Sequence, residues 1–495
     1  MEPSLLALTS KLRQLYKLGI VINPWLAGVD SASRFDPGLF EQLDLEAREY
    51  SKVHWTEAEA IQNFDTLPVP TEFPRIALYE TFASTAVFIA HEQTGNLLVD
   101  EKITLKAIDK VENFCNIHGL GSLVYIYRLL TAYDNLNAIN YFGSIPEREF
   151  LLGSWHRPWV DYSLSDDLMI GVLHNTFQIV IRDDRRYVEI TPKGMEFLID
   201  LRQALEESGH FLHRIKFLHI SQFNLFNDYE KLGEEIWPQA MPLRKQLIDY
   251  SGIKPGMRVL ELGSGSGLLT FEAGLADRIG PEGNLICIDP SVGMMNRAKA
   301  KPQAQGKNWV EFQIGRAEDI PFEDGSFDAV VGVSFLQFTE QKIALKEMRR
   351  VTRSGGVVAS VHPLAYDYKN IPFFHEWFSP IFQLATNNKK QPRSYLINLE
   401  EILETFAKAG LTQIECQQPP FPMLFHDPDK IIKHFIHGVG LFQEELADLP
   451  WKARQEIMES LQERGVHVCE RYPKEKRVVY QPAQLVKGIV SWEND

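Results

Sequence analysis

The stretch VLELGSGSGL, residues Val259–Leu268, decides the fold of this 495-residue chain. Its apolar residues predict a buried strand, and the three alternating glycines predict a sharp turn directly after that strand. Glycine also lets the backbone approach a ligand with no Cβ in the way. Residues 268–279 then predict a helix whose N-terminal amides point at whatever the loop holds. The pattern is typical of a nucleotide-type site at the carboxyl end of a central parallel strand.

The spacing of the glycines indicates which kind of nucleotide fits this loop. A dinucleotide-binding loop has the pattern G-x-G-x-x-G, whereas this loop has Leu268 in place of the last glycine. Glu261 stands just before the loop, where its carboxylate would repel a pyrophosphate and attract an ammonium group. A ligand that is part nucleoside and part amino acid satisfies both observations. The loop alone leaves open an ordinary strand–turn–helix whose glycines serve packing.

A second carboxylate favours the ligand interpretation. Residues Asn284–Asp289 predict another short apolar strand, and Asp289 ends it about two dozen residues after the glycine loop. A ribose-binding acid belongs at this position of a nucleotide-binding α/β domain.

These residues resemble the first motif of the class I S-adenosylmethionine-dependent methyltransferases, acidic-x-G-x-G-x-G. Residues 315–331 look like the G-D-A-E-x-L-P-F and S-F-D-x-V block of the quinone-biosynthesis type of these enzymes. Residues 347–358 match their E-x-x-R-V-L-x-P-G-G segment before the fifth strand. With the acid at Asp289, four blocks follow in the family's order within residues 257–361. The resemblance implies an α/β fold with a Rossmann-like seven-stranded methyltransferase domain.

The resemblance also implies the cofactor, S-adenosyl-L-methionine, and the residues that bind it. In this family the acid at Asp289 holds the ribose hydroxyls, and an apolar residue near Met294 packs on the adenine. The implied cofactor-binding residues are Glu261, Gly263, Ser264, Gly265, Gly267, Asp289, Pro290, Met294, Ala317, Glu318 and Ser334.

Arg316 is a departure from the family pattern, which usually has Asp at this position. The family's Asp accepts a hydrogen bond from the adenine amino group, and arginine offers donors only. Either Glu318 or a backbone carbonyl takes that role, or the adenine is held by stacking and by the Ala317 amide.

Composition sets the outer limits. A chain of this length predicts two or three domains. No apolar run approaches the roughly 18 residues of a membrane helix, and the N-terminus lacks a signal-peptide pattern. The four cysteines are scattered without metal-ligand spacing, so we expect no metal site and a reducing cytoplasmic location. The net charge is −15, and residues 1–240 carry nearly all of the acidic excess. Such a surface repels nucleic acid phosphates, so nucleic acid is not an expected partner, and the lack of a long apolar run means that a membrane is not expected either.

Residues 177–198 predict a hairpin followed by a helix. Two alternating runs surround a polar tip at 183–186, and Thr191-Pro192 then provides a helix cap and a first-turn proline. The segment looks like the wing and closing helix of a winged-helix module, with earlier helices at about 103–117 and 120–133. The predicted organisation is a helical region at 1–100, a mostly helical, winged-helix-like domain at 101–220 and a methyltransferase domain at 221–495.

Winged helices either bind DNA or form the dimerisation domain of small-molecule O-methyltransferases. The acidic N-terminal half favours the second role, and with it a homodimer through the N-terminal domain. The alternative is a winged-helix transcriptional regulator that uses the methyltransferase fold as a ligand sensor. The feature that favours DNA binding is a group of three arginines at the hairpin tip, Arg182, Arg185 and Arg186.

The residues that would bind the methyl acceptor are predicted from their position relative to the fifth strand. An aromatic-rich insertion at about 363–398 follows the fifth strand, Val357–Val361, and would roof a small, apolar or aromatic substrate. His362 directly follows that strand and is the first candidate for a general base, with His375 and Asp367 as further candidates. Tyr229, ahead of the domain, is either a lid residue over the cofactor or a core aromatic. The predicted function is methyl transfer from S-adenosylmethionine to a small-molecule substrate.

Overall fold

The computed structural model describes residues 132–156, 164–207, 223, 228–364, 368–387, 399–438, 442–446 and 448–492. The chain forms two compact units. Unit 1 comprises Met1–Gln222 with Phe442–Glu459, and unit 2 comprises Phe223–Leu441 with Ser460–Asp495. The predicted helical region 1–100 and the predicted helix 103–117 lie outside the described residues, as does most of the predicted helix 120–133.

Unit 1 contains the predicted hairpin. Strands β2 (Phe177–Arg182) and β3 (Arg185–Ile190) pair antiparallel, and β1 (Ile145–Pro146) pairs with the other edge of β3. The turn consists of Asp183 and Asp184, whose φ angles are +48° and +58°. Two successive positive φ angles suit the right-handed twist of a two-residue hairpin, and aspartate tolerates them. The polar tip is therefore the connection that the sequence predicts.

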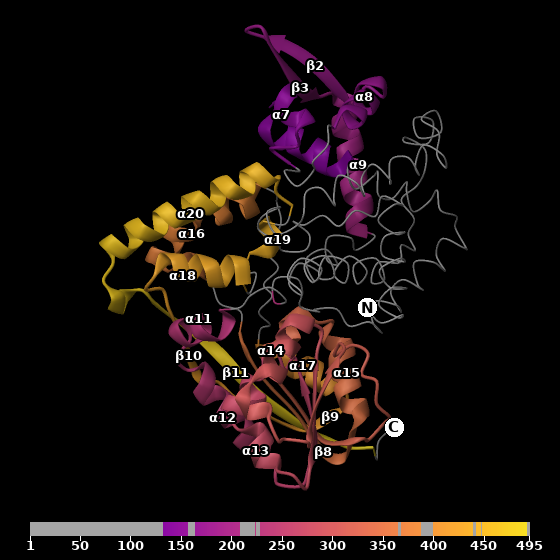
Figure 1. Cartoon of the computed structure of the whole chain (residues 1–495), viewed down its shortest axis with the longest axis vertical. Helices are drawn as coiled ribbons and strands as arrows, with labels where there is room; N and C mark the ends of the chain where they lie inside the picture. The colour runs from indigo at the N-terminus through magenta and orange to yellow at the C-terminus, as the bar shows by residue number, and fades with distance from the viewer. Residues whose placement is uncertain are drawn as a thin grey trace, which may run out of the picture. The chain divides into compact units, whose positions relative to one another are not determined.

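Helices lie at one end of this small sheet, and the β2–β3 hairpin projects beyond them (Figure 1). Residues 132–142 are helical, α7 (Glu147–Leu151) and α8 (Ser165–Leu173) lie between β1 and β2 in the chain, and α9 (Pro192–Glu207) follows β3. The predicted cap of α9 is confirmed, because the Gly194 amide donates to the Thr191 hydroxyl over 3.0 Å. The core of unit 1 contains Leu136, Phe150, Leu168, Phe177, Val188 and Leu198. From sequence alone, α7 and α8 were not predicted.

Residues late in the chain complete unit 1. Helix α19 (Gln443–Leu446) and the first part of α20 (Trp451–Arg471) belong to it. The Tyr133 hydroxyl donates to Asp448 over 2.5 Å, and Arg202 forms a 2.9 Å ion pair with the same carboxylate. Lys452 lies 3.6 Å from the centre of the Trp155 ring. Unit 1 is thus discontinuous in sequence.

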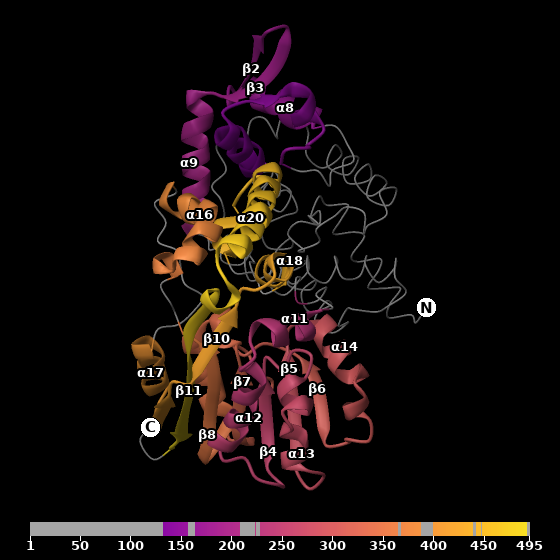
Figure 2. The same ribbon diagram turned by 90° about the vertical axis from the view of Figure 1, so that its left-hand side faces the viewer.

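Unit 2 is built on an eight-stranded sheet of order β10-β11-β8-β7-β4-β5-β6, with β9 also paired to β11. Figure 2 shows the strands from β11 to β6 side by side. Their bounds are β4 Arg258–Leu262, β5 Asn284–Asp289, β6 Val310–Ile314, β7 Phe327–Val333, β8 Thr352–Pro363, β9 Leu411–Gln417, β10 Pro420–Leu424 and β11 Val478–Val490. Strands β4 to β8 run parallel, and β11 is antiparallel to its neighbours.

This arrangement is a Rossmann-like methyltransferase sheet with one added strand. Without β10 the order has the seven strands that the sequence predicts, and β10 extends the edge beside β11. The predicted last strand, at 480–490, and the predicted strand six, at 411–416, are both confirmed, each with one or two more residues. Because all five parallel strands end at the same edge, the loops after them gather there.

Helices cover both faces of the sheet. On one face, α12 (Ala240–Tyr250) and α13 (Leu275–Ile279) bury Leu247 and Leu275 against Val259 and Leu285. On the other, α15 (Gln341–Val351) and α17 (Leu399–Lys408) pack on β4, β7, β8 and β11. In Figure 1, α12 and α13 lie on one side of the strands and α15 on the other. No helix of the described part of the chain is long and apolar enough to cross a membrane.

Two predicted elements differ in their bounds. The helix expected at 268–279 is a short π-helix, Leu268–Glu272, followed by α13, and Gly274 with φ +89° separates them. The fifth strand extends beyond the predicted Val357–Val361 at both ends: it begins at Thr352, which pairs with Phe327 of β7, and it continues to Pro363, where β11 pairs with it. The antiparallel partner, distant in sequence, supplies hydrogen bonds that the local pattern could not reveal.

The remaining segments of unit 2 are helices. They are α11 (Tyr229–Ile236), α14 (Val292–Ala300), η3 (Pro302–Ala304), η4 (Leu336–Phe338), η5 (Tyr368–Asn370), α16 (Pro372–Asn387), α18 (Pro428–Ile432), the π-helix η6 (Lys433–Gly438) and η7 (Lys474–Lys476). The predicted helix at 450–461 is the first half of the longer α20.

Candidate cofactor and acceptor site

The glycine loop follows β4, and its three glycines lie in the left-handed region of backbone conformation. Gly263, Gly265 and Gly267 have φ angles of +64°, +55° and +85°. The amides of Gly263 and Ser264 both donate to the Ile288 carbonyl, over 2.8 and 3.2 Å. The loop is therefore tied to the adjacent strand β5 and turns away from the sheet at its carboxyl end.

Two glycines of this loop differ in what a side chain would meet. A Cβ on Gly263 would lie 2.5 Å from the Phe335 Cβ, whereas a Cβ on Gly265 meets nothing within 4 Å. Left-handed backbone disfavours alanine at either position, by about 1–2 kcal/mol, and the clash at Gly263 adds roughly 1–3 kcal/mol. We expect Gly263→Ala to unfold at clearly lower urea concentration than Gly265→Ala.

The variants Gly263→Ala and Gly265→Ala also distinguish an effect on folding from an effect on cofactor binding. Gly265→Ala keeps the fold but places a methyl group in the open space beside the loop, so its S-adenosylmethionine affinity should fall. Urea unfolding and calorimetric titration measure both effects. Equal stability of the two variants would contradict the predicted contact with Phe335.

Asp289 ends β5 and holds the loop. One of its carboxylate oxygens accepts from the Gly265 amide and the other from the Ser291 amide, each over 2.8 Å. Burial raises the pKa of Asp289 to about 6, against the pull of these two amides. The carboxylate is 8% exposed, and each oxygen has capacity for a further donor. The structure therefore brings together the loop and the acid that the sequence places 24 residues apart.

Glu261 lies deeper than the sequence suggests. Its carboxyl is buried below the loop, accepts from the Thr270 hydroxyl over 2.7 Å and lies 3.7 Å from the Cys287 sulfur. Burial raises the pKa of Glu261 to about 8, more than the hydrogen bonds from Thr270 and Cys287 lower it. At neutral pH such a group is mainly protonated, so it joins β4 to Thr270 and to Cys287 of β5 as a neutral acid.

The other predicted cofactor residues lie near the same edge of the sheet. Pro290 precedes Ser291, whose hydroxyl caps α14 by accepting from the Met294 amide over 3.2 Å. Met294 is 2% exposed and Ala317 is 7% exposed. Ser334 follows β7 with φ +51°, and its amide donates to the Val361 carbonyl over 2.8 Å.

Glu318 is already engaged. Its carboxylate accepts from the Glu340 amide, at the start of α15, over 2.9 Å. Arg316 bridges to Asp319 in a tight turn of the backbone. Of the acceptors predicted for the adenine amino group, Glu318 therefore already holds a backbone donor.

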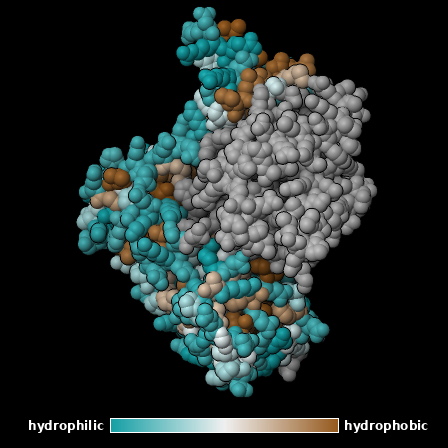
Figure 3. All heavy atoms as spheres, in the orientation of Figure 1, coloured by the Kyte–Doolittle hydropathy of each residue, from teal (hydrophilic) through white to brown (hydrophobic). Residues whose placement is uncertain are grey.

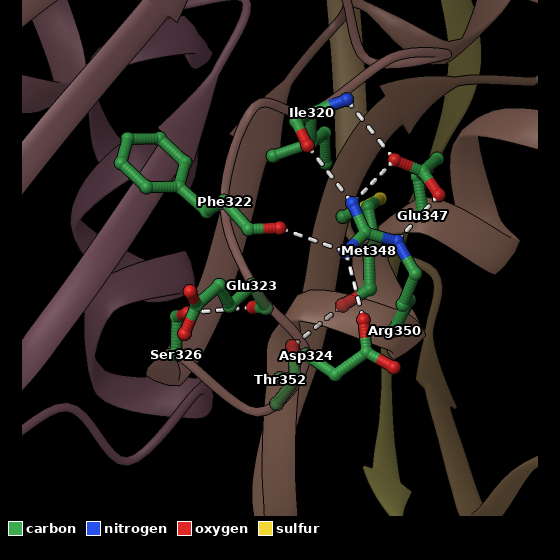
Figure 4. Close-up of polar contacts among 9 residues, drawn as sticks. All are labelled: Ile320, Phe322, Glu323, Asp324, Ser326, Glu347, Met348, Arg350 and Thr352. Atoms are coloured by element: carbon green, nitrogen blue, oxygen red, sulfur yellow. Dashed lines mark hydrogen bonds and ion pairs between the residues drawn. The ribbon is translucent and has the colours of Figure 1, made fainter.

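A clamp that was not predicted fixes the segment after Ala317 (Figure 4). Arg350 uses all five of its N–H groups: three bonds of 2.7–2.9 Å reach the carboxylates of Glu347 and Asp324, and two reach the carbonyls of Ile320 and Phe322. Glu347 also accepts from the Ile320 amide over 3.0 Å. The E-x-x-R pair of the sequence motif thus positions the loop beside the predicted adenine site.

A short helix stands at the edge of the cofactor region. Tyr229 begins α11, and its ring packs 5.8 Å from that of Phe223 and 5.9 Å from that of His434. Burial raises the pKa of Tyr229, and the nearby Asp289 carboxylate acts in the same direction. Ion pairs Asp228–Lys433 and Glu235–Lys430 tie α11 to η6 and α18. Tyr229 is thus an anchored aromatic within electrostatic reach of Asp289.

The general-base candidates have different positions. His362 lies inside β8, opposite Gln484 of β11, and not after the strand as predicted, because the pairing continues to Pro363. It is 2% exposed, and burial lowers its pKa to about 4. His375 is exposed on α16, where its ring stacks on Phe382. Asp367 lies outside the described residues.

Gln484 is a buried polar residue that sequence reasoning missed. It is fully buried in β11, although the strand that carries it is otherwise mainly apolar. The signal that could have revealed it is a glutamine within the mainly apolar run 483–490, because a buried side-chain amide normally requires hydrogen-bond partners.

The predicted roof is a compact aromatic layer. Phe373, Phe374 and Phe378 of α16 are fully buried and pack around Phe425. The Trp377 indole donates to the Leu461 carbonyl over 2.9 Å, so α16 is anchored to the part of α20 that belongs to unit 2. In Figures 1 and 2, α16 and α18 lie beyond the carboxyl ends of the parallel strands.

Comparison with known proteins agrees with this geometry. Residues 260–360 match the family model of a methyltransferase domain. The demethylmenaquinone methyltransferase of Lactococcus lactis is 30% identical over 226 residues, which cover 43% of this chain and 86% of that protein. That of Geobacillus stearothermophilus is 26% identical over 234 residues, which cover 45% and 95%. The YcgJ protein of Bacillus subtilis overlaps 50% of this chain and 97% of its own, at 20% identity and a TM-score of 0.33.

The family follows from the first of these relatives together with the sheet order and the glycine loop. The chain belongs to the class I S-adenosylmethionine-dependent methyltransferases, and S-adenosylmethionine is its cofactor.

Proposed function

We propose that this methyltransferase acts on a small, apolar molecule with an aromatic or quinol ring. The strand order carries the proposal: β7 separates the cofactor loop after β4 from the polar side chains of β8 and β11. Those side chains, His362 and Gln484, lie at the carboxyl end of β8, where a ligand of an open α/β sheet binds. The relatives named for demethylmenaquinone support a ring-bearing acceptor.

We assign the cofactor contacts as follows. The backbone of Gly263, Gly265 and Gly267 admits the ligand closely, and Asp289 accepts from the ribose hydroxyls. Met294 and Ala317 flank the adenine, with Pro290, Ser264, Glu318 and Ser334 around them and Glu261 beneath. The cofactor supplies a sulfonium-activated methyl group. What remains for the protein is to align a nucleophile in a dry site, which can lower a barrier by several kcal/mol.

The proposed role of His362 follows from its environment. A neutral imidazole at pH 7 can accept a hydrogen bond from an acceptor hydroxyl, which orients that hydroxyl and draws electron density toward the ring. With a pKa of about 4, the imidazole is a weak base, so it is better suited to accepting a hydrogen bond from the hydroxyl than to removing its proton. We therefore propose His362 as the group that contacts the acceptor.

For the N-terminal part, we propose a winged-helix-like module that dimerises. The order helix 132–142, β1, α7, α8, β2, β3 and α9 matches that of a winged helix, in which α8 would be the DNA-reading helix. Helix α8 carries no Lys or Arg and exposes Met169, Val172 and Leu173. Figure 3 shows hydrophobic atoms gathered there. An apolar face suits a second copy of the chain better than DNA phosphates.

The hairpin arginines support the same choice. Arg186 pairs with Glu147 through two contacts of 2.5 and 2.8 Å, and Arg182 pairs with Glu189. Two of the three tip arginines are thus neutralised within unit 1, and the regulator alternative has no supporting observation. A cytoplasmic location remains a prediction from the scattered cysteines, of which Cys287, Cys416 and Cys469 are free thiols.

Calorimetric titration followed by a transfer assay tests the proposal. We expect micromolar binding of S-adenosylmethionine and of its demethylated product. With radiolabelled cofactor, label should move to an extractable, reduced naphthoquinone such as demethylmenaquinol. Binding without transfer to any hydroxylated ring in a panel of phenols and naphthols would refute the acceptor class and leave the family assignment intact.

A further inference from the structure

Two buried polar side chains face each other across strands β8 and β11. In the antiparallel ladder, His362 and Gln484 are direct partners, so both side chains leave the sheet on the same face. Their exposed fractions are 2% and 0%. The pair is held by a regular ladder that continues for several residues toward Ile489.

Neither side chain has a hydrogen-bond partner in the described part of the chain. Both ring nitrogens of His362 and both amide atoms of Gln484 are buried and unpaired. Ser360, one step back along the same face of β8, also has an unpaired hydroxyl. Buried polar atoms are nearly always paired, because an unmade hydrogen bond in the interior is costly. Several such atoms on one face call for a functional explanation.

Their place in the sheet points to the acceptor. Val358 and Val486, on the same face, belong to the apolar cluster that includes Leu345 and Phe406. Toward the carboxyl end of β8 this apolar face becomes polar at Ser360 and then at the His362–Gln484 pair. Strand β7 lies between the pair and the glycine loop of β4. The pair therefore stands on the opposite side of β7 from the glycine loop and Asp289.

The chemistry of the pair defines its ligand. A neutral imidazole offers one donor and one acceptor, and the glutamine amide offers a carbonyl oxygen and two N–H donors. We propose that His362 and Gln484 together hydrogen-bond an oxygen substituent on the ring of the methyl acceptor, a hydroxyl above all, and so select hydroxylated rings. This rests on the proposed function.

The site discriminates against a ring without a hydroxyl because such a ring would leave the side chains of His362 and Gln484 without hydrogen-bond partners. A site built to hydrogen-bond a hydroxyl rejects the analogue that lacks it, because the site's buried groups then stay unpaired. The burial that lowers the pKa of His362 keeps its ring neutral, so the unprotonated ring nitrogen can accept a hydrogen bond from the hydroxyl of the acceptor. Gln484 can donate to the same oxygen.

The proposed selection of hydroxylated rings is tested by anaerobic titration of the protein with ring compounds, in the presence of saturating S-adenosylhomocysteine. The probes are 1,4-dihydroxynaphthalene and naphthalene. We expect the wild-type protein to prefer the diol, and Gln484→Leu and His362→Leu each to weaken diol binding at least about tenfold. Cofactor affinity should stay within about twofold of wild type, which also reports that each variant is folded.

Gln481 provides a matched control on the same strand. It is also buried, but its amide donates to the Leu364 carbonyl over 2.7 Å. Gln481→Leu should therefore lower the unfolding midpoint and keep the preference for the diol. Gln484→Leu should raise that midpoint, because it removes an unpaired polar group without breaking a bond.

Two results would overturn the inference while the cofactor still binds. One is undiminished diol affinity in Gln484→Leu, and the other is equal wild-type affinity for the diol and naphthalene. Failure of the wild-type protein to bind either form of the cofactor is a different outcome, since it would overturn the proposed function and the inference with it.

Discussion

Asp289→Ala is expected to weaken S-adenosylmethionine binding by at least about 100-fold, or roughly 2.7 kcal/mol. The change removes the acceptor for the ribose hydroxyls, and hydrogen bonds to a charged acceptor contribute about 1.5–3 kcal/mol each. It also frees the Gly265 and Ser291 amides, so the glycine loop loses the contact that shapes it. Calorimetric titration at pH 8, above the raised pKa of this carboxyl, measures the effect with wild-type Asp289 ionised.

Two further variants make this result specific. Asp277→Ala, on α13, removes an exposed carboxylate paired with Lys307 and should leave cofactor affinity unchanged. Asp289→Asn keeps the side-chain size but turns an amide nitrogen toward one of the two backbone donors, so its affinity should also fall. If Asp289→Ala bound the cofactor as well as Asp277→Ala did, the ribose contact would have to lie elsewhere.

Glu261→Gln is expected to stabilise the protein increasingly as pH rises. The folded-state pKa of Glu261 is raised to about 8 from 4.5, so between these values the folded protein keeps a proton that the unfolded chain releases. The contribution of Glu261 to stability is therefore complete below pH 4.5 and is lost as pH rises through 8. Glutamine cannot ionise and removes this dependence. The difference should reach about 3 kcal/mol at pH 7.

Urea unfolding of both proteins at several pH values checks this prediction. The stabilities should converge near pH 4.5 and diverge with a slope of at most about 1.4 kcal/mol per pH unit up to pH 8. Glu311→Gln, at an exposed position on β6 beside Asn284, should show no such divergence. A difference that stays constant with pH would mean that Glu261 ionises normally in the folded protein.

The cofactor half of the site could be predicted from sequence because its parts are local. Each block consists of a strand followed directly by its loop, and the order of the blocks fixes which loops meet at the carboxyl edge. The contact between Asp289 and Gly265 follows from that order. The carboxyl of Glu261 was harder to place, since its neighbours Thr270 and Cys287 come from other elements.

The acceptor half depends on contacts between distant segments. Gln484 meets His362 only because the last strand inserts antiparallel beside β8, more than a hundred residues after it in the chain. The same insertion lengthens β8 and moves His362 from the predicted loop into the strand. Local periodicity carries no information about such partners. Helix α8 was missed for a related reason: its apolar residues lie on both its buried and its exposed sides.

The discontinuity of unit 1 affects how the protein can be made. Asp448 and Lys452, which contact Tyr133, Arg202 and Trp155, are translated some 250 to 315 residues after these partners. Domains usually fold in order as they leave the ribosome, at about 5–20 residues per second. Here the first unit must wait for most of the second before its last contacts can form. The nascent chain therefore passes through a stage lasting on the order of ten seconds or more, in which that unit lacks its closing helix.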